Sequence, residues 1–194
     1  MNARKSLEGR LKHRAKWLLG FLLLLWVVHI LNEFTGRSMN GWGIVPRSWR
    51  GLIGIPLSPF IHGSWKHLIL NSIPFIALGG LVVARGASVF VELTAFVAVL
   101  GGAAVWLLAD FFEETTNSHI GASGLIFGYF GFLVARGWYD RSIFAVVVAV
   151  FVIVLYGGVI ATGLLPTSNG VSWEGHLFGL LAGIMAAKGE KPTP

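Results

Sequence analysis

A serine set among glycines is the residue of this chain best suited to covalent chemistry. Ser123 lies in residues 120–128, IGASGLIFG, and apolar residues continue beyond them. A serine hydroxyl attacks a carbonyl only after a base takes its proton, and histidine suits that role because it titrates near neutral pH. His176 is the candidate base. A structural reading competes with this one, because serine and glycine also mediate close helix contacts inside membranes.

Attack on a peptide bond also requires hydrogen-bond donors for the oxyanion that forms. His67, Asn71 and the backbone N–H of Ser123 are the candidate donors, and a helix that begins at Ser123 adds its positive end to that anion. The chain has no cysteine, which excludes a thiol nucleophile. It also lacks His-Glu-x-x-His and any comparable zinc spacing, so we expect neither a metal nor another cofactor.

The elements that position these residues are expected to be membrane-spanning helices. The chain has 194 residues, of which 55% are hydrophobic and only 12% charged, whereas a soluble domain carries about 25% charged residues. The hydrophobic residues form long blocks, which predicts an all-α, polytopic membrane protein surrounded by a lipid bilayer. In a membrane protein, a net charge of +6 indicates basic residues gathered on the cytoplasmic side. We therefore expect no nucleic-acid partner.

The hydrophobic blocks predict six transmembrane helices in one compact domain. The first block resembles the core of a signal peptide, but no small-residue cleavage site follows Ile30, so a retained helix is expected. Residues 32–61 are rich in Gly, Pro and Trp and predict a long first loop in or against the bilayer surface. We expect a basic tail at 1–16, the six-helix domain at 17–187, a short tail at 188–194, and helices at 17–31, 64–84, 89–108, 121–136, 143–159 and 174–187.

The distribution of basic residues predicts that both termini are cytoplasmic. With that orientation, eleven of the 15 Lys and Arg fall on the inner side, and only Arg37, Arg47, Arg50 and Lys66 fall on the outer side. The acidic residues Asp110, Glu113 and Glu114 fall on the outer side too. The inner basic residues are Arg4, Lys5, Arg10, Lys12, Arg14, Lys16, Arg85, Arg136, Arg141, Lys188 and Lys191.

The unusual polar residues of the predicted second, fourth and sixth helices share one depth. These helices run from outside to inside, and their first turns hold His62, His67, Asn71, Ser123 and His176. At 1.5 Å per residue, the five lie within roughly 10 Å of one another in depth. Ionisable side chains at such depth normally face the bundle interior or a water-filled cavity. The sequence therefore predicts a polar site that opens to the outer face.

Several polar residues, including some of these five, also have a structural interpretation. His29 is expected to hydrogen-bond between helices, and His13 is expected to be solvated. His119 begins the fourth helix, although its closeness to Ser123 keeps a role at the site open. Asn71 can bond a neighbouring helix instead of a substrate. His62 and His67 are five residues apart, so they do not share one helical face.

At these residues the chain closely resembles the rhomboid family of intramembrane serine proteases, over nearly all of residues 49–183. The family's Gly-x-Ser-Gly motif carries its nucleophile and a glycine-rich motif on the last core helix carries its base. A His-x-x-x-x-His-x-x-x-Asn pattern supplies oxyanion donors, and a Trp-Arg pair marks the first long loop. The matching residues are Gly121, Ser123 and Gly124; Gly175, His176, Gly179 and Gly183; His62, His67 and Asn71; and Trp49 and Arg50.

The resemblance implies a six-helix bundle and a dyad of Ser123 and His176 with no acidic third member. Glu174 lies two residues from His176 and should point elsewhere on the helix. Phe127 stands where many bacterial members have a tyrosine that stacks under the histidine. The ring is thus kept without its hydroxyl, and we expect a modest effect on the rate.

Glycines on the fourth and sixth helices indicate how the dyad would meet. Gly124 and Gly128 lie on one face of the fourth helix, and Gly179 and Gly183 lie on one face of the sixth. Small residues at this spacing let two membrane helices approach closely. The two faces are therefore expected to pack together.

The resemblance favours a serine endopeptidase that cleaves membrane-anchored proteins in or near their transmembrane segments. One alternative is a catalytically inactive rhomboid-like protein that binds transmembrane helices, and another is a transporter or channel lined by His67, Asn71 and His176. The predicted fifth helix is a candidate substrate gate because a glycine-containing loop follows it. The short basic tail favours a prokaryotic inner membrane. The physiological substrate, cleavage-site preference and oligomeric state have no signal in the sequence.

Overall fold

The computed structural model describes residues 2–110, 118–140, 142–166 and 172–190, with the backbone alone for 2–7. These residues are almost entirely helical, and the extended pairing among them is one isolated bridge between Ile44 and His119. The predicted all-α membrane fold class is confirmed. The elements are α1 Asn2–Phe34, η1 Ser38–Trp42, η2 Trp49–Ile53, α2 Gly54–Leu57, η3 Ser58–Phe60, α3 Trp65–Arg85, α4 Ala87–Phe96, η4 Val97–Gly101, α5 Gly102–Leu108, α6 Ser123–Tyr139, α7 Ile143–Gly163 and α8 Trp173–Gly189.

Four helical stretches in the described part of the chain are long and apolar enough to cross a membrane. They are Glu8–Phe34, Trp65–Arg85, Ala87–Leu108 and Ile143–Gly163. The other two expected spans, α6 and α8, have 17 residues each. At 1.5 Å per residue, 17 residues extend about 26 Å, slightly less than the roughly 30 Å hydrocarbon core. Length and composition therefore support four of the six expected spans.

Two elements differ from the sequence-based expectation in where they begin or how they continue. Helix α1 begins at Asn2, not near Trp17, because a high density of charge keeps a segment out of the bilayer but does not stop it from being helical. The expected third helix is interrupted by the π-helical turn η4 between α4 and α5. The first loop forms short helical turns, η1, η2, α2 and η3, and includes no span.

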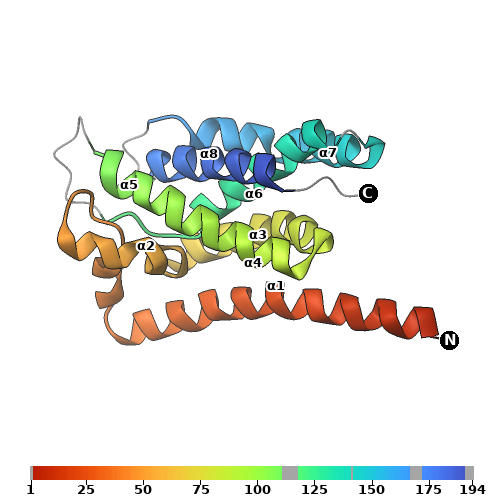
Figure 1. Ribbon diagram of the computed structural model, residues 1–194. Coiled ribbons are helices and arrows are strands. Elements are labelled where there is room, and N and C mark those ends of the chain that lie inside the picture. The colour runs from red at the N-terminus through yellow and green to blue at the C-terminus, as the bar shows by residue number, and fades with distance from the viewer. Residues whose placement is uncertain (1, 111–117, 141, 167–171, 191–194) are drawn as a thin grey trace.

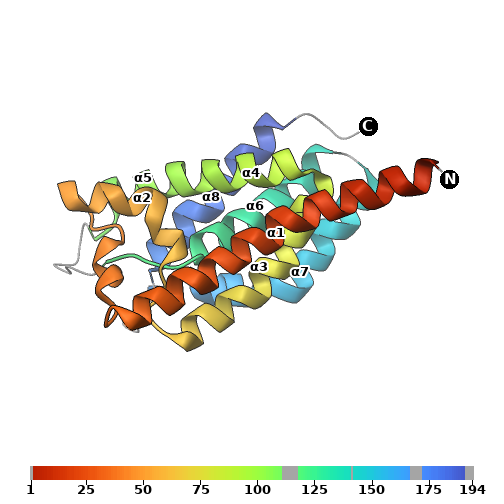
Figure 2. The ribbon, with the colours of Figure 1, turned by 90° about the horizontal axis from the view of Figure 1, so that it is seen from below.

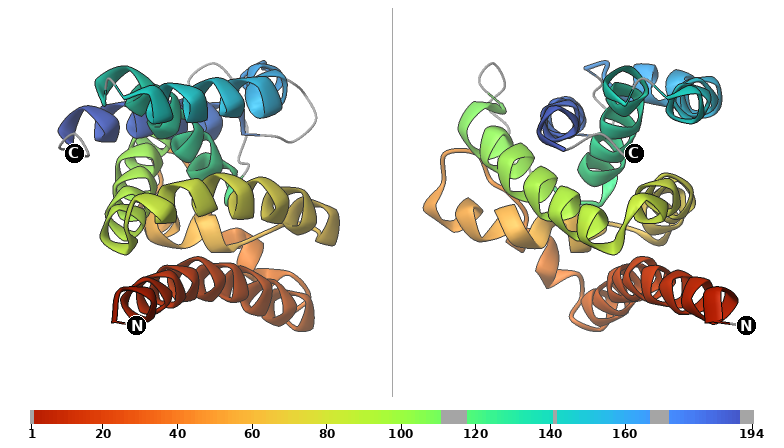
Figure 3. Two further views of the ribbon diagram at one scale, coloured as in Figure 1. Left: turned by 90° about the vertical axis from the view of Figure 1, so that its right-hand side faces the viewer. Right: turned by 45° about the vertical axis from the view of Figure 1, so that its right-hand side comes forward.

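Helix α6 is the central element of the bundle. It contacts α3, α7, α8 and η4, and it lies between α8, α7 and α3 in the right-hand view of Figure 3. Helix α1 lies on the outside, against α3 and α4, and runs along one face of the bundle in Figure 1 and Figure 2. Helix α7 packs on α6 and leaves large apolar side chains exposed along its length. Side chains from several helices can therefore contact a residue on α6.

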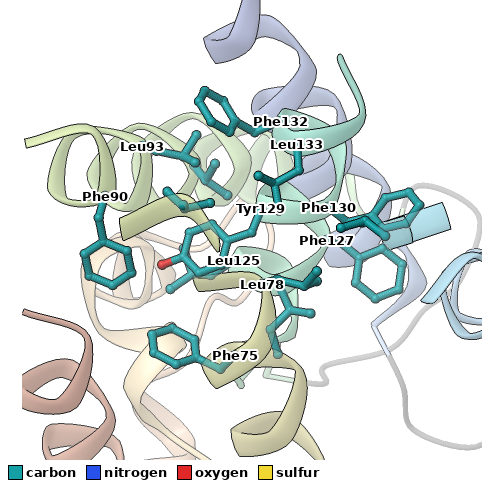
Figure 4. Packing of buried hydrophobic residues seen from close by; sticks show 14 of the residues in the cluster. Phe75, Leu78, Phe90, Leu93, Leu125, Phe127, Tyr129, Phe130, Phe132 and Leu133 are labelled. Carbon is teal, nitrogen blue, oxygen red and sulfur yellow. The ribbon is translucent and has the colours of Figure 1, made fainter. Parts of the chain in front are cut away.

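The apolar core surrounds Tyr129 on α6. Its ring centroid lies 5.7 Å from that of Phe75 and 5.8 Å from that of Phe90, and Figure 4 shows the three rings together. The buried hydroxyl is 2.7 Å from the hydroxyl oxygen of Thr94, so its polar tip has a partner. Because lipid tails are as apolar as these side chains, close packing is what stabilises this contact between helices.

An arginine cluster joins the helices at the end of α6 that is opposite Ser123. Arg85 donates to the carboxylate of Asp140 at 2.8 Å, and Arg136 donates both to that carboxylate and to the carbonyl oxygen of Ala187. Burial alone raises the pKa of Asp140, but hydrogen bonds from the two arginines outweigh it and hold the pKa below its usual value. Arg14 of α1 donates to the carbonyl oxygen of Ala84 at 2.7 Å.

Four of the expected charged positions, Glu113, Glu114, Arg141 and Lys191, lie outside the described residues.

Candidate active site

The segment before Ser123 is held in place through its backbone. The Gly121 N–H donates to the carbonyl oxygen of Ser58 at 2.9 Å, and the Ala122 N–H donates to Nε2 of His62 at 3.3 Å. Ser123 is the first residue of α6, so the helix does not use its own backbone N–H. Ser123 lines a cavity of about 50 Å³, which Gly121, Gly124 and Gly175 also line and which has room for water.

Gly121 lies next to the two candidate side-chain donors, in the segment that leads to Ser123. Its φ of 116° lies in the left-handed region that favours glycine. A Cβ atom there would lie 2.7 Å from Cε1 of His67 and 3.6 Å from Nδ2 of Asn71, so both side chains come close to this backbone. Nδ2 of Asn71 is buried and has no hydrogen-bond partner among the described residues. A buried amide N–H without a partner is a donor available to a developing anion.

His62 supports the segment before Ser123 and is not exposed to solvent. It is fully buried, and burial together with the neighbouring His67 lowers its pKa to about 3. The ring is therefore neutral near pH 7, which lets Nε2 accept the Ala122 N–H. Nδ1 of His29 lies 3.1 Å from the carbonyl oxygen of His62, so the bond expected of His29 goes to the backbone before α3.

His176 is held from two sides. Its Nδ1 lies 2.7 Å from the carbonyl oxygen of Gly163 at the end of α7, which requires Nδ1 to carry the proton. Nε2 then keeps its lone pair and can act as a base. The ring of Phe127, one turn after Ser123, stacks on the imidazole with centroids 4.0 Å apart and an interplanar angle of 10°. The stack places the imidazole against α6, one turn beyond Ser123.

The expected glycine contact between α6 and α8 is present. A Cβ atom on Gly179 would clash with the carbonyl oxygen of Gly124, and one on Gly183 would clash with the carbonyl oxygen of Gly128. Only glycine permits these backbones to approach so closely, which is why the first turns of α6 and α8 adjoin.

The remaining predicted site residues lie elsewhere. Trp49 is 86% exposed and Arg50 is also exposed, and no hydrogen bond or ring contact among the described residues joins either of them to the site. Glu174 is buried but makes no described contact with His176, whose Nδ1 bonds a backbone carbonyl instead. No group of three or more metal-binding side chains occurs in the part of the chain that the structure describes.

Three residues at the site were given no site role from sequence, and a site role for a fourth, His119, was left open. Gly163 accepts from His176, whereas Asp110, His119 and Ser172 form a hydrogen-bond chain beside the cavity. A serine three residues before Gly175 matches the pattern of a helix N-cap, so the cap at Ser172 had a sequence signal. A backbone carbonyl such as that of Gly163 leaves no such signal.

Comparison with known proteins gives one consistent family. A family described as Rhomboid domain matches residues 47–189. An uncharacterized protein of Mycobacterium tuberculosis and one of Mycobacterium bovis are each 38% identical over 183 residues, which cover 90% of this chain and 76% of the relative. An uncharacterized protein of Mycobacterium leprae is 36% identical over 190 residues, which cover 93% of this chain and 75% of the relative.

Proposed function

We propose that this chain, which belongs to the rhomboid family, is a serine endopeptidase that hydrolyses peptide bonds in or near transmembrane segments of membrane-anchored proteins. The observation that carries this proposal is the placement of His176. The imidazole is stacked on Phe127 and donates through Nδ1 to Gly163, so its basic nitrogen is Nε2. Its helix adjoins the first turn of α6, where Ser123 lies.

The chemistry begins when Nε2 of His176 takes the proton of the Ser123 hydroxyl. The Ser123 oxygen then attacks the substrate carbonyl carbon, and the carbonyl oxygen becomes an oxyanion. The backbone N–H of Ser123 and Nδ2 of Asn71 donate to that oxygen, and His67 lies beside them. As this intermediate collapses, the C–N bond breaks and His176 gives its proton to the leaving amine. Water then attacks the acyl carbon while His176 takes its proton, and His176 returns that proton to the Ser123 oxygen as the carboxylic acid leaves.

The Gly163 carbonyl replaces the carboxylate of a three-member serine protease site in this mechanism. A carboxylate there keeps the imidazole in the correct tautomer and orientation, and the carbonyl can do both through one hydrogen bond. It brings no full negative charge, so it stabilises the imidazolium less. The residues that act directly are therefore Ser123 and His176, with Phe127 as a positioning residue.

The membrane arrangement proposed here has six spans, with α6 and α8 enclosed by the longer helices. Residues 17–187 form the protease domain between a basic segment at 1–16 and a short tail at 188–194. Ser123 and the arginine cluster mark opposite ends of α6, and basic residues mark the cytoplasmic side. The termini are then cytoplasmic and the site opens to the outer face of a bacterial plasma membrane. The proposed substrate path passes α7, which packs on α6.

Covalent labelling of the purified protein with a fluorophosphonate probe tests this proposal. Wild type is expected to label, and Ser123→Ala and His176→Ala are expected to abolish both labelling and cleavage of a single-span membrane substrate. Ser72→Ala is the matched control, because this serine is also buried but donates to the Leu68 carbonyl within α3. Absence of labelling in wild type, beside a rhomboid protease that labels, would favour a helix-binding protein without activity.

A further inference from the structure

Three polar side chains outside the proposed dyad form a continuous hydrogen-bond chain. Nε2 of His119 lies 3.3 Å from a carboxylate oxygen of Asp110, and Nδ1 of His119 lies 2.6 Å from the hydroxyl oxygen of Ser172. The side chains of Asp110 and His119 are only 6% and 9% exposed. Such a buried chain stabilises one arrangement only when every member has its partner.

The Asp110 carboxylate, at one end of this hydrogen-bond chain, determines the direction of its first hydrogen bond. An ionised Asp110 can only accept, so Nε2 of His119 donates to it, and in the neutral ring Nδ1 then keeps the lone pair. With that tautomer, the Ser172 hydroxyl donates to Nδ1. Its oxygen is left to accept the backbone N–H of Gly175 at 3.1 Å, which makes Ser172 the N-cap of α8.

This hydrogen-bond chain lies close in sequence to both Ser123 and His176. His119 lies four residues before Ser123, and Ser172 lies four residues before His176. The backbone of His119 is itself paired with Ile44 through two hydrogen bonds of 3.0 and 2.9 Å. The side-chain bond between His119 and Ser172 thus links the segment that leads to the nucleophile directly to the first turn of the helix that carries the base.

The Asp110 end of the hydrogen-bond chain is also held in place, through its backbone. Arg47 of the first loop donates to the carbonyl oxygen of Ala109 at 2.6 Å and to that of Asp110 at 3.1 Å. Asp110 itself has a φ of 53°, a left-handed conformation that Asp and Asn tolerate better than most residues. The backbone that carries the Asp110 carboxylate is therefore held by the first loop just after the end of α5.

We infer that Asp110, His119 and Ser172 are positioning residues that set the distance between Ser123 and His176, an inference that rests on the proposed protease function. Without the Ser172 cap, the first turn of α8 loses its side-chain acceptor and frays, and His176 lies in that turn. Without His119, the cap is no longer tied to the nucleophile segment. A displacement of about 1 Å between reacting groups can cost roughly 100-fold in rate.

The test measures kcat, KM and the fluorophosphonate labelling rate for Ser172→Ala, His119→Phe and the double variant in purified full-length protein. Each single variant is expected to lower kcat and the labelling rate about tenfold with KM unchanged, because alignment matters in the transition state. The double variant is expected to be no slower than the slower single variant, since the two residues act through one bond. Ser172→Thr keeps the hydroxyl and is expected to restore most of the activity.

Ser142→Ala is the matched control. Ser142 caps α7 by accepting the Ala145 N–H at 3.1 Å, the same cap length as in α8, but no described contact ties it to the site. It is expected to lose a similar amount of thermal stability while kcat changes less than about twofold. This comparison separates loss of a cap in general from loss of the cap that is tied to His119.

Four outcomes would overturn the inference. If wild type labels and the His119 and Ser172 variants keep its kcat, these residues do not position the dyad, although the protease function stands. If the two single effects multiply in the double variant, they do not act through one bond. If Ser123→Ala still labels and Ser172→Ala does not, Ser172 is the nucleophile itself. An unlabelled wild type overturns the protease function and this inference together.

Discussion

Nδ1 of His176 lies 2.7 Å from the carbonyl oxygen of Gly163, the last residue of α7. This bond joins the proposed base to the helix that we propose as the substrate path. Movement of the end of α7 would therefore change the orientation of the imidazole as well as access to it. Gly163 also lies close to the ring of Phe127, so it adjoins both the imidazole and the ring that stacks on it.

Substitution of Gly163 by alanine is expected to impair the base. A Cβ atom there would lie 2.6 Å from Cζ of Phe127 and 3.2 Å from Nδ1 of His176, so the stacked pair must shift. We expect kcat in cleavage of a single-span substrate to fall by roughly tenfold or more, because the imidazole moves relative to the serine. Gly158→Ala on the same helix is the control, since a Cβ atom at Gly158 meets nothing within 4 Å. Equal activity of the two variants would contradict the assignment.

Removal of Asn71 is expected to lower activity without lowering stability. Nδ2 of this buried side chain has no partner among the described residues, so Asn71→Ala breaks no hydrogen bond of Nδ2 there. Loss of one oxyanion donor is expected to lower kcat by about 100-fold or more with little change in KM. Kinetics and thermal unfolding in detergent measure the two effects.

Asn32 provides the opposite case as a control for Asn71. It is fully buried, donates to Oδ1 of Asn40 at 2.8 Å and accepts the Met39 N–H at 3.0 Å. Asn32→Ala is therefore expected to lower the unfolding temperature with no comparable loss of kcat in the folded fraction. A destabilised Asn71→Ala variant with unchanged kcat would show that Asn71 has a structural role alone.

The aromatic ring at Phe127 is expected to matter more than a hydroxyl on it. The ring stacks on His176 at 4.0 Å, and an aromatic pair of this kind contributes about 0.5–1.5 kcal/mol beyond area burial. Phe127→Leu is expected to lower kcat by up to about tenfold, whereas Phe127→Tyr should stay within about threefold of wild type. A comparison of kcat at saturating substrate decides this. Equal losses in both variants would show that ring stacking is not the relevant property.

The close contact between α6 and α8 predicts where a single methyl group is not tolerated. A Cβ atom on Gly179 would clash with the carbonyl oxygen of Gly124, which belongs to backbone and cannot rotate away. Gly179→Ala is expected to destabilise the fold by roughly 1–3 kcal/mol, seen as a lower unfolding temperature in detergent. Gly189→Ala, at the open end of the same helix, should have almost no effect. Unchanged unfolding of Gly179→Ala would mean that the two helices can separate at little cost.

The buried His62 predicts a loss of stability in acid. Its pKa is lowered to about 3 in the folded protein, against about 6.5 for an unperturbed histidine. The unfolded chain therefore takes up a proton at pH values where the folded chain does not. The stability that the neutral ring contributes is fully present above about pH 6.5 and is lost progressively as the pH falls from there towards 3.

Thermal unfolding between pH 8 and pH 4.5 measures this effect. Wild type is expected to lose more of its unfolding temperature over this range than His62→Gln, whose amide oxygen can still accept the Ala122 N–H without titrating. His13→Gln is the control, because it removes a histidine from the exposed part of α1 and leaves the contact between His62 and Ala122 in place. A His62→Gln variant with the same acid slope as wild type would contradict the prediction.

Much of the candidate site could be predicted from the sequence because its side chains are chemically distinctive. Serine, histidine and asparagine are rare and costly in apolar helices, so their shared depth in three blocks pointed to one location. The spacing of Gly124 with Gly128 and of Gly179 with Gly183 indicated which helix faces meet, and the structure has that contact. The family follows from the same motifs, and the comparisons agree.

Other features were decided only by the tertiary structure. Gly163 orients His176 through a backbone carbonyl, and every residue has such a carbonyl, so no residue type reveals which one will be used. Asp110, His119 and Ser172 come from three separate segments, and their bonds exist only because those segments end side by side. Sequence determines which side chains can do chemistry and which helix faces are small, since both are local properties. The partners that hold them depend on packing between segments distant in the chain, which only the folded structure sets.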